Sequence, residues 1–187
     1  ASYIFLFILF GAILVRSGAG RFFINVAMAL TGSKVGGPAK ASVVSSCLMA
    51  SVSGSAVANV VTTGSFTIPL MKRVGYRSYF AGAVEACASS GGQIMPPIMG
   101  AAAFVIAEFM NVPYLYVAKA SIFPAVIYFF SIFVMVHFEA RRKNLGTVSR
   151  EELPDLKSEL KHSGHLFLSI LLIIVLMVAG YTPMLAA

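Results

Sequence analysis

The stretch SVSGSAVANVVTTGSFTIP, residues 51–69, carries no charge, yet it is rich in hydroxyl side chains. It lies within 31 uncharged residues between Lys40 and Lys72, of which ten are Ser or Thr and one is Asn59. A run of this length is long enough to enter a bilayer, since about 20 helical residues cross the hydrocarbon core. Non-helical backbone at that depth must face protein or a water-filled cavity. Because this stretch is also rich in polar side chains, we do not expect it to face lipid.

The composition indicates an integral membrane protein. The chain is 58% hydrophobic and 11% charged, with a mean hydropathy of +0.87, whereas soluble domains contain about 25% charged residues. The net charge of +7 comes from basic residues at the ends of apolar segments, a pattern that orients membrane spans and does not indicate nucleic-acid binding. Because the chain begins inside an apolar run, we expect it to be a fragment of a longer protein.

The charge pattern predicts that residues 40–72 form a re-entrant hairpin. If this segment enters and leaves by one face of the membrane, 13 of the 14 basic residues lie on the cytoplasmic side. The exception is Lys119, whose long side chain can reach the outer interface. If the segment instead crossed the membrane, Lys34 and Lys40 would lie outside, against the positive-inside rule.

Residues 78–110 are predicted to form a discontinuous span. As one helix they would reach about 50 Å, which exceeds the bilayer core. They contain SGGQIMPPIMG (90–100), whose paired glycines and paired prolines disfavour regular helix. We therefore expect half-helices over 79–89 and 98–110, joined by an unwound middle.

The remaining segments complete an all-α membrane fold. The spacing of Phe22, Val26 and Leu30 predicts a short interfacial helix over 22–31. A return span is expected over 114–136, a cytoplasmic arm helix over 147–162 and a further span over 165–182. Ser149 and Glu152 have the spacing of a helix-capping box at the start of the arm.

The hairpin and the broken span together suit ion binding. The hairpin tip SGS (53–55) would leave free carbonyls on one arm and free amides on the other. The unwound GGQIMPP (91–97) would add carbonyls at similar depth, as in secondary transporters that bind an ion near the midplane. With Asn59, these neutral oxygens suit Na⁺. The same small residues also suit close helix packing, and composition alone leaves both interpretations open.

Two stretches carry a family resemblance: SGSAVANVVTTGSFTIPLMKRVGY (53–76) and AGAVEACASSGGQIMPPIMGAAAF (81–104). They resemble the large membrane (DctM-like) subunit of tripartite ATP-independent periplasmic (TRAP) transporters, and most nearly the fused permeases that work with TAXI-type binding proteins. The resemblance implies an elevator-type, sodium-driven importer of a small organic acid in the inner membrane of a bacterium or archaeon. It also implies two partners, a periplasmic TAXI-type binding protein and a small membrane subunit or its fused equivalent.

The resemblance also implies site residues. The ion-binding set carried over by position is Ser53, Gly54, Ser55, Asn59, Gly92, Met95 and Pro97, the last three through their carbonyls. The substrate-binding set is Ser55, Thr62, Thr63 and Gln93. Other branches of the family tend to carry Asp at position 59 and Pro at position 93. No resident cofactor is expected, and Na⁺ is the coupling ion.

Glu85 is the one acidic residue expected at membrane depth, where such a group is a functional candidate. It could serve a cation pathway or accept hydrogen bonds from the hairpin hydroxyls, and we favour the structural role. An ion channel or pore built from broken helices is the alternative function, although the chain has no repeated pore-lining segment. Enzyme activity is not expected, because the sequence offers no nucleophile with a base and no metal cluster at membrane depth.

Overall fold

The computed structural model describes residues 2–149 and 152–179, and all regular structure in these residues is helical. The elements are α1 (Ser2–Arg16), α2 (Ala19–Thr31), α3 (Gly37–Ser53), α4 (Ala56–Arg73), α5 (Ser78–Gly91), the 3₁₀ helix η1 (Gly92–Ile94), α6 (Ala101–Phe109), α7 (Tyr114–Arg142), α8 (Leu156–Ser163) and α9 (His165–Val178). The prediction of an all-α fold is confirmed.

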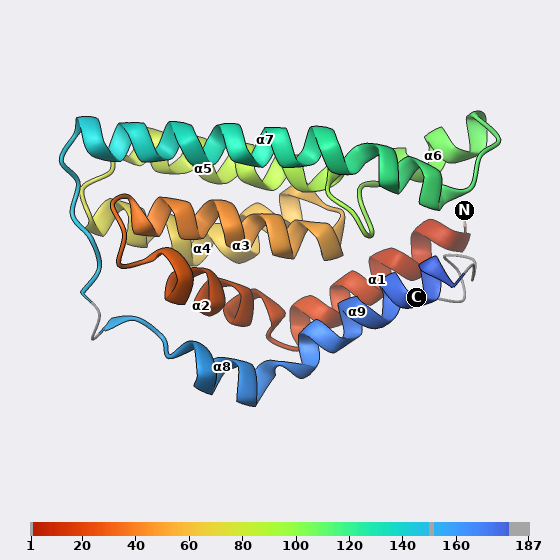
Figure 1. The fold of residues 1–187 in the computed structure, drawn as a ribbon, viewed down its shortest axis with the longest axis horizontal. Coiled ribbons are helices and arrows are strands. Elements are labelled where there is room, and N and C mark those ends of the chain that lie inside the picture. The colour runs from red at the N-terminus through yellow and green to blue at the C-terminus, as the bar shows by residue number, and fades with distance from the viewer. Residues whose placement is uncertain (1, 150–151, 180–187) are drawn as a thin grey trace.

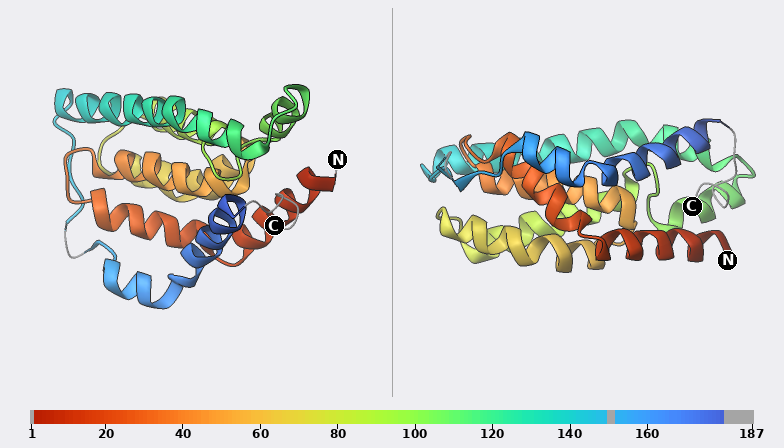
Figure 2. Two further views of the ribbon diagram at one scale, coloured as in Figure 1. Left: turned by 45° about the vertical axis from the view of Figure 1, so that its right-hand side comes forward. Right: turned by 90° about the horizontal axis from the view of Figure 1, so that it is seen from below.

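Helix α3 lies at the centre of the molecule. Figure 1 shows α5 and α7 as one layer, α3 and α4 as the next, and α2 on the far side of α3, with α8 beyond it. Helix α3 contacts α1, α2, α4, α5, α7 and η1. The left-hand view of Figure 2 shows the same order. A central helix touched from all sides must present small residues, which explains its run of Ser and Ala.

Helices α3 and α4 form an antiparallel hairpin with a two-residue tip. Helix α3 starts with Pro38 in its first turn, where a missing N–H costs nothing. It ends at Gly54, whose left-handed φ of 61° favours glycine. Ser55 then caps α4 by accepting a hydrogen bond from the Ala58 N–H at 3.3 Å. The hairpin is a feature of the fold, and its re-entry into a membrane stays a prediction.

The chain after α5 leaves helical structure between Met95 and Gly100. The N–H of Gly100 donates to the Gln93 carbonyl at 2.8 Å, which closes the segment into a loop. The N–H of Ile98 donates to the Ser51 carbonyl at 3.1 Å, so the loop is fixed to the end of α3. That α5 and α6 cross a membrane as one interrupted span stays a prediction.

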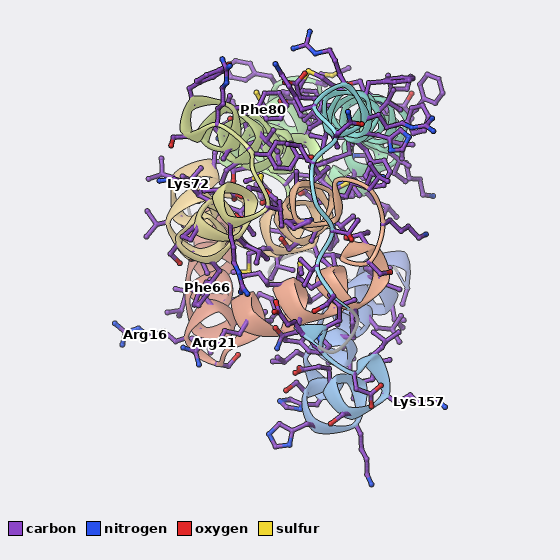
Figure 3. The ribbon with its side chains drawn as sticks, turned by 90° about the vertical axis from the view of Figure 1, so that its left-hand side faces the viewer. Arg16, Arg21, Phe66, Lys72, Phe80 and Lys157 are labelled. Atoms are coloured by element: carbon purple, nitrogen blue, oxygen red, sulfur yellow. The ribbon has the colours of Figure 1, made fainter. Side chains whose placement is uncertain are left out.

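Most residues of helix α2 are buried against protein, and its location at a membrane interface stays a prediction. Phe22 and Val26 belong to the core, while Leu30 is 50% exposed. The helix packs on α3 and lies between it and α8 (Figure 1). On its other side, the Arg21 guanidinium lies over the Phe66 ring of α4 at 5.6 Å, as Figure 3 shows. Protein contacts therefore cover Phe22 and Val26 of the apolar stripe, while Leu30 stays half exposed. The spacing of the stripe does not distinguish protein contacts from lipid contacts.

The arm helix is shorter than the predicted range of 147–162. It begins at Leu156, because Pro154 has no N–H to continue a helix and Asp155 caps the first turn. The Asp155 carboxylate accepts hydrogen bonds from the N–H groups of Lys157 and Ser158 at 3.4 and 3.2 Å. Ser149 forms only a backbone turn with Glu152, and the residues between them lie outside the described residues. The N-cap of α8 is therefore Asp155, six residues after the predicted N-cap Ser149.

One described helix, α7, is long and apolar enough to cross a bilayer by itself. Two bent pairs reach the same threshold when each pair is counted as one span: Leu9–Arg16 with Ala19–Thr31, bent by 66°, and Leu156–Ser163 with His165–Leu176, bent by 60°. Length and composition therefore allow one to three spans among the described residues. The predicted final span, 165–182, includes residues 180–182, which lie outside the described residues. Elevator-type movement also stays a prediction.

Candidate functional site

The hairpin tip and the loop after α5 enclose a pocket, which we call the tip pocket. Its volume is about 360 Å³. Its lining residues are Ser53, Gly54, Ser55, Gln93, Ile98, Met99, Gly100, Ala101, Ala102 and Phe104. The two walls approach closely because Gly54 has no side chain: a Cβ there would lie 2.2 Å from the Met99 carbonyl oxygen. Four of the residues expected at the site, Ser53, Gly54, Ser55 and Gln93, therefore lie together.

Two helices begin at the tip pocket. Ser55 is the N-cap of α4, and Ala101 and Ala102 form the first turn of α6. First-turn N–H groups have no acceptor within their own helix, and the helix dipole makes this end positive. The pocket thus has a chemistry that suits an anion, and the hydroxyls of Ser53 and Ser55 add neutral hydrogen-bonding groups.

A second polar cluster lies deeper in the hairpin, around Glu85, and we call it the hydroxyl cage. The Glu85 carboxylate is fully buried. Five hydroxyls contact it: Ser42 at 2.6 Å, Ser46 at 2.9 Å, Thr67 at 2.5 Å, Ser89 at 3.3 Å and Thr63 in a short hydrogen bond. The cage joins α3, α4 and α5, so the expected contact between Glu85 and the hairpin hydroxyls is present.

Asn59, on α4, lies beside the hydroxyl cage and bonds to both α3 and α5. Its side chain is fully buried, and its amide nitrogen donates to the Ser46 carbonyl and to the Ser89 hydroxyl, each at 3.1 Å. Asn59 therefore holds α3, α4 and α5 together and does not line the tip pocket. Thr63 also lies outside the tip pocket, because its hydroxyl donates to Glu85 in the hydroxyl cage.

The other expected site residues lie in different places. Met95 and Pro97 line a separate apolar cavity of about 360 Å³ on the α7 and α9 side of the loop. The Pro97 carbonyl accepts a hydrogen bond from Tyr114 at 3.1 Å, and the Gly92 carbonyl accepts one from the Met95 N–H at 3.2 Å. Thr62 faces α2, where a Cβ on Gly20 would lie 2.6 Å from its methyl group. The predicted site residues therefore do not share one pocket, and their roles as ligands stay predictions.

Ser42, Ser46 and Thr67 were not predicted individually as partners of Glu85. A signal was present, because the polar residues recur every fourth position: Ser42 and Ser46 on α3, Asn59, Thr63 and Thr67 on α4, and Glu85 and Ser89 on α5. Spacing of four places side chains on one helix face. Three such stripes within an apolar chain predict a shared polar interior, but only the packing shows that they meet at Glu85.

A polar hairpin that packs against a second break in helical structure is an arrangement that secondary transporters use. The comparisons identify the family: the DctM component of the tripartite ATP-independent periplasmic transporters matches residues 1–187, and the chain belongs to this family.

Relatives from several bacteria carry the name C4-dicarboxylate TRAP transporter large permease protein DctM. The one from Pseudomonas aeruginosa is 30% identical over 182 residues, covering 97% of this chain and 42% of the relative. The one from Vibrio cholerae is 29% identical over 171 residues, covering 91% and 37%. The chain thus spans about two fifths of the length of these relatives, which are named as permeases and not as enzymes.

The isethionate TRAP transporter permease protein DctMQ from Oleidesulfovibrio alaskensis is also similar. It is 37% identical over 91 residues, covering 49% of this chain and 14% of the relative. The 14% coverage means that most of that longer protein has no counterpart in the present chain.

Proposed function

We propose that the full-length protein is the permease of a secondary transporter that imports a small organic acid by Na⁺ symport. In this proposal it lies in the cytoplasmic membrane of a bacterium or archaeon and crosses it several times. A periplasmic binding protein of the TAXI type delivers the substrate. A small membrane subunit, or an equivalent segment fused to the permease, completes the complex.

The tip pocket is the observation that carries the proposal. It lies where two interrupted helical elements meet, and two helix N-termini border it. A carboxylate is stabilised at such helix ends without a buried basic side chain. The pocket is therefore suited to hold the acid group of a substrate, with Ser55 and Gln93 as hydrogen-bonding groups.

The names of the relatives support an acidic substrate. They mention C4-dicarboxylates, isethionate and 2,3-diketo-L-gulonate, and each of these compounds carries an acid group. We infer from this shared chemistry that the full-length protein takes a small organic anion.

We place the proposed Na⁺ site at the hairpin tip, next to the substrate. Helix α3 ends there, and the last carbonyls of a helix form its negative end. The hydroxyls of Ser53 and Ser55 supply further neutral oxygens. An ion held by neutral groups keeps its positive charge, which offsets the substrate carboxylate in surroundings where an unpaired charge is costly.

Transport assays on the complete permease test this proposal. Proteoliposomes should take up a labelled organic acid only with the binding protein outside and an inward Na⁺ gradient. Ser53→Ala should raise the Na⁺ concentration for half-maximal uptake severalfold, because it removes one neutral ligand. Ser65→Ala is the matched control, since this exposed hydroxyl donates to its own helix at the Thr62 carbonyl. Full uptake without a Na⁺ gradient would reject Na⁺ symport.

The same assay separates a transporter from a channel, the alternative function. A transporter saturates with substrate and requires its binding protein, whereas a pore conducts in proportion to the gradient. Flux that does not saturate and does not depend on the binding protein would favour the channel.

A further inference from the structure

We propose that the hydroxyl cage around Glu85 is a proton-binding site, in which the carboxylate takes up and releases one proton derived from water. This site is separate from the proposed Na⁺ site at the hairpin tip. It is a property of α3, α4 and α5, so it does not depend on the substrate or the coupling ion of the transporter.

The first argument is charge. Glu85 is fully buried, and among the residues that the structure describes no Lys, Arg or His forms an ion pair or hydrogen bond with it. A buried carboxylate without a counter-ion is costly in a low-dielectric interior, even with several hydrogen bonds. Binding one proton removes this charge and its cost.

The neighbouring ionisable groups are engaged elsewhere. On α3, the Lys40 nitrogen lies 2.9 Å from His137 Nδ1 of α7 and 5.3 Å from the centre of the Phe133 ring. On α7, Glu139 pairs with Arg142. At the end of α4, Arg73 pairs with Glu152. The other ionisable groups on α3, α4, α5 and α7 have no described hydrogen bond or ion pair with Glu85; they are Cys47, Lys72, Tyr79, Cys87, Tyr114, Tyr116, Lys119, Tyr128 and Arg141.

The second argument is that the cage can satisfy both protonation states. Thr63 and Thr67 each have one hydroxyl hydrogen and at least two acceptors within reach. One acceptor is Glu85, and the other is a carbonyl of their own helix, at Asn59 (2.8 Å) and Thr63 (3.0 Å) respectively. With Glu85 ionised, the threonines donate to it. With Glu85 protonated, its new O–H donates to one hydroxyl oxygen, and that hydroxyl turns its hydrogen to the helix carbonyl.

The third argument concerns size. The cage oxygens are already in direct hydrogen-bond contact with the carboxylate, at 2.5 Å for Thr67 and 2.6 Å for Ser42. A metal ion would have to enter between these oxygens and push them apart. A proton needs no such space, because it forms an O–H bond on one carboxylate oxygen and the charge falls from −1 to 0. The close packing therefore favours a proton over a metal ion.

Infrared difference spectroscopy of the complete permease during acidification tests the proposal without a transport assay. The wild type should gain a carboxylic acid C=O band that shifts in D₂O. Glu85→Gln, which keeps the size of the side chain, should lose this band. The exposed Glu108 provides the matched control, and Glu108→Gln should keep the band. Identical difference spectra for the wild type and Glu85→Gln would overturn the proposal.

A second variant keeps the test decisive if Glu85→Gln does not fold. Thr67→Val preserves shape and removes one hydrogen bond to the carboxyl group, so the band should move to higher wavenumber. Thr62→Val is the control on the same helix, because the Thr62 hydroxyl donates to the Ala58 carbonyl and does not contact Glu85. A band that is unchanged in Thr67→Val would also overturn the proposal. Since neither result depends on Na⁺ or substrate, it cannot be confused with failure of the proposed function.

Discussion

At the scale of single residues, two kinds of position determine the site. Gly54 and Gly92 allow backbones to approach, and Glu85 and Asn59 join three helices through hydrogen bonds. The sequence predicted that the glycines near the tip matter, because glycine pairs interrupt helices. It could not predict that Asn59 points away from the pocket, because the direction of a side chain depends on how the helices are rotated against each other.

Gly92→Ala should destabilise the protein by about 1–3 kcal/mol, since overpacking forces neighbouring backbones apart. A Cβ at this position would lie 1.7 Å from the Ala50 Cβ of α3. Thermal unfolding of the purified permease measures the effect. Gly82→Ala is the matched control, because its added Cβ meets nothing within 4 Å, and alanine in a helix should stabilise it by about 0.5–1 kcal/mol. Equal stability of the two variants would contradict the close approach.

Tyr76→Phe should leave the stability unchanged or raise it slightly. The Tyr76 hydroxyl is buried and has no hydrogen-bond partner among the described residues, while its ring stacks on Phe80 with centroids 5.6 Å apart. Burial, and then the negative charge of Glu139, raises the pKa of Tyr76 to about 12, so the hydroxyl stays neutral near pH 7. Removing an unpaired polar group relieves its desolvation cost. A loss of more than about 1 kcal/mol in thermal unfolding would indicate that the hydroxyl has a partner.

At the scale of the elements, glycine and proline predicted where helices end. The spacing of apolar residues was a weaker guide to what covers a helix face. Gly54 ends α3, and the segment of paired glycines and prolines after α5 is non-helical. By contrast, the stripe on α2 did not predict that much of the helix packs against α3. An apolar stripe predicts that one face of a helix is buried from water, but it does not predict whether lipid or protein covers that face.

The start of the arm helix gives a test at this scale. Asp155→Ala should increase hydrogen exchange in the first turn of α8, because loss of an N-cap costs about 1 kcal/mol. Asp155→Asn should retain most of the protection, since its amide oxygen can still accept from the Ser158 N–H. Ser149→Ala should have no effect on α8, because the helix does not begin there. Protection lost in Ser149→Ala and kept in Asp155→Ala would restore the capping-box start.

At the scale of the whole molecule, the ends of the hairpin and of α7 gather on one side. A Cβ at Gly36, before α3, would lie 2.9 Å from the Tyr76 hydroxyl and 2.8 Å from Ala140, and the N–H of Gly146 donates to the Val74 carbonyl at 3.3 Å. Figure 1 shows the α6–α7 turn at the opposite end of the molecule. The basic residues Lys34, Lys72, Arg73, Arg77, Arg141, Arg142 and Lys143 lie in or next to these gathered segments. Seven of the 14 basic residues therefore lie near one end of the molecule, and the predicted cytoplasmic location of 13 of the 14 stays a prediction.

Membrane topology provides the final prediction. The positive-inside rule assigns the basic end to the cytoplasm, so cysteines at the exposed positions Ser33 and Ser78 should react only with reagents supplied from that side. Gly36 is less suitable for a cysteine, because its φ of 70° favours glycine. The native Cys47 and Cys87 would be replaced by Ala first.

Met110→Cys is the opposing control. Met110 is 61% exposed and lies in the turn between α6 and α7, so it should react only from outside. If α3 and α4 form a re-entrant hairpin, Ser33 and Ser78 must share one side. If α5 and α6 then cross the membrane as one interrupted span, Met110 must lie on the other side. Labelling of Ser33→Cys from outside, with Ser78→Cys labelled from the cytoplasm, would mean that the segment between them crosses the membrane. In that arrangement the tip could not lie at mid-depth with both arms on one side, and the proposed Na⁺ site would lose its structural basis.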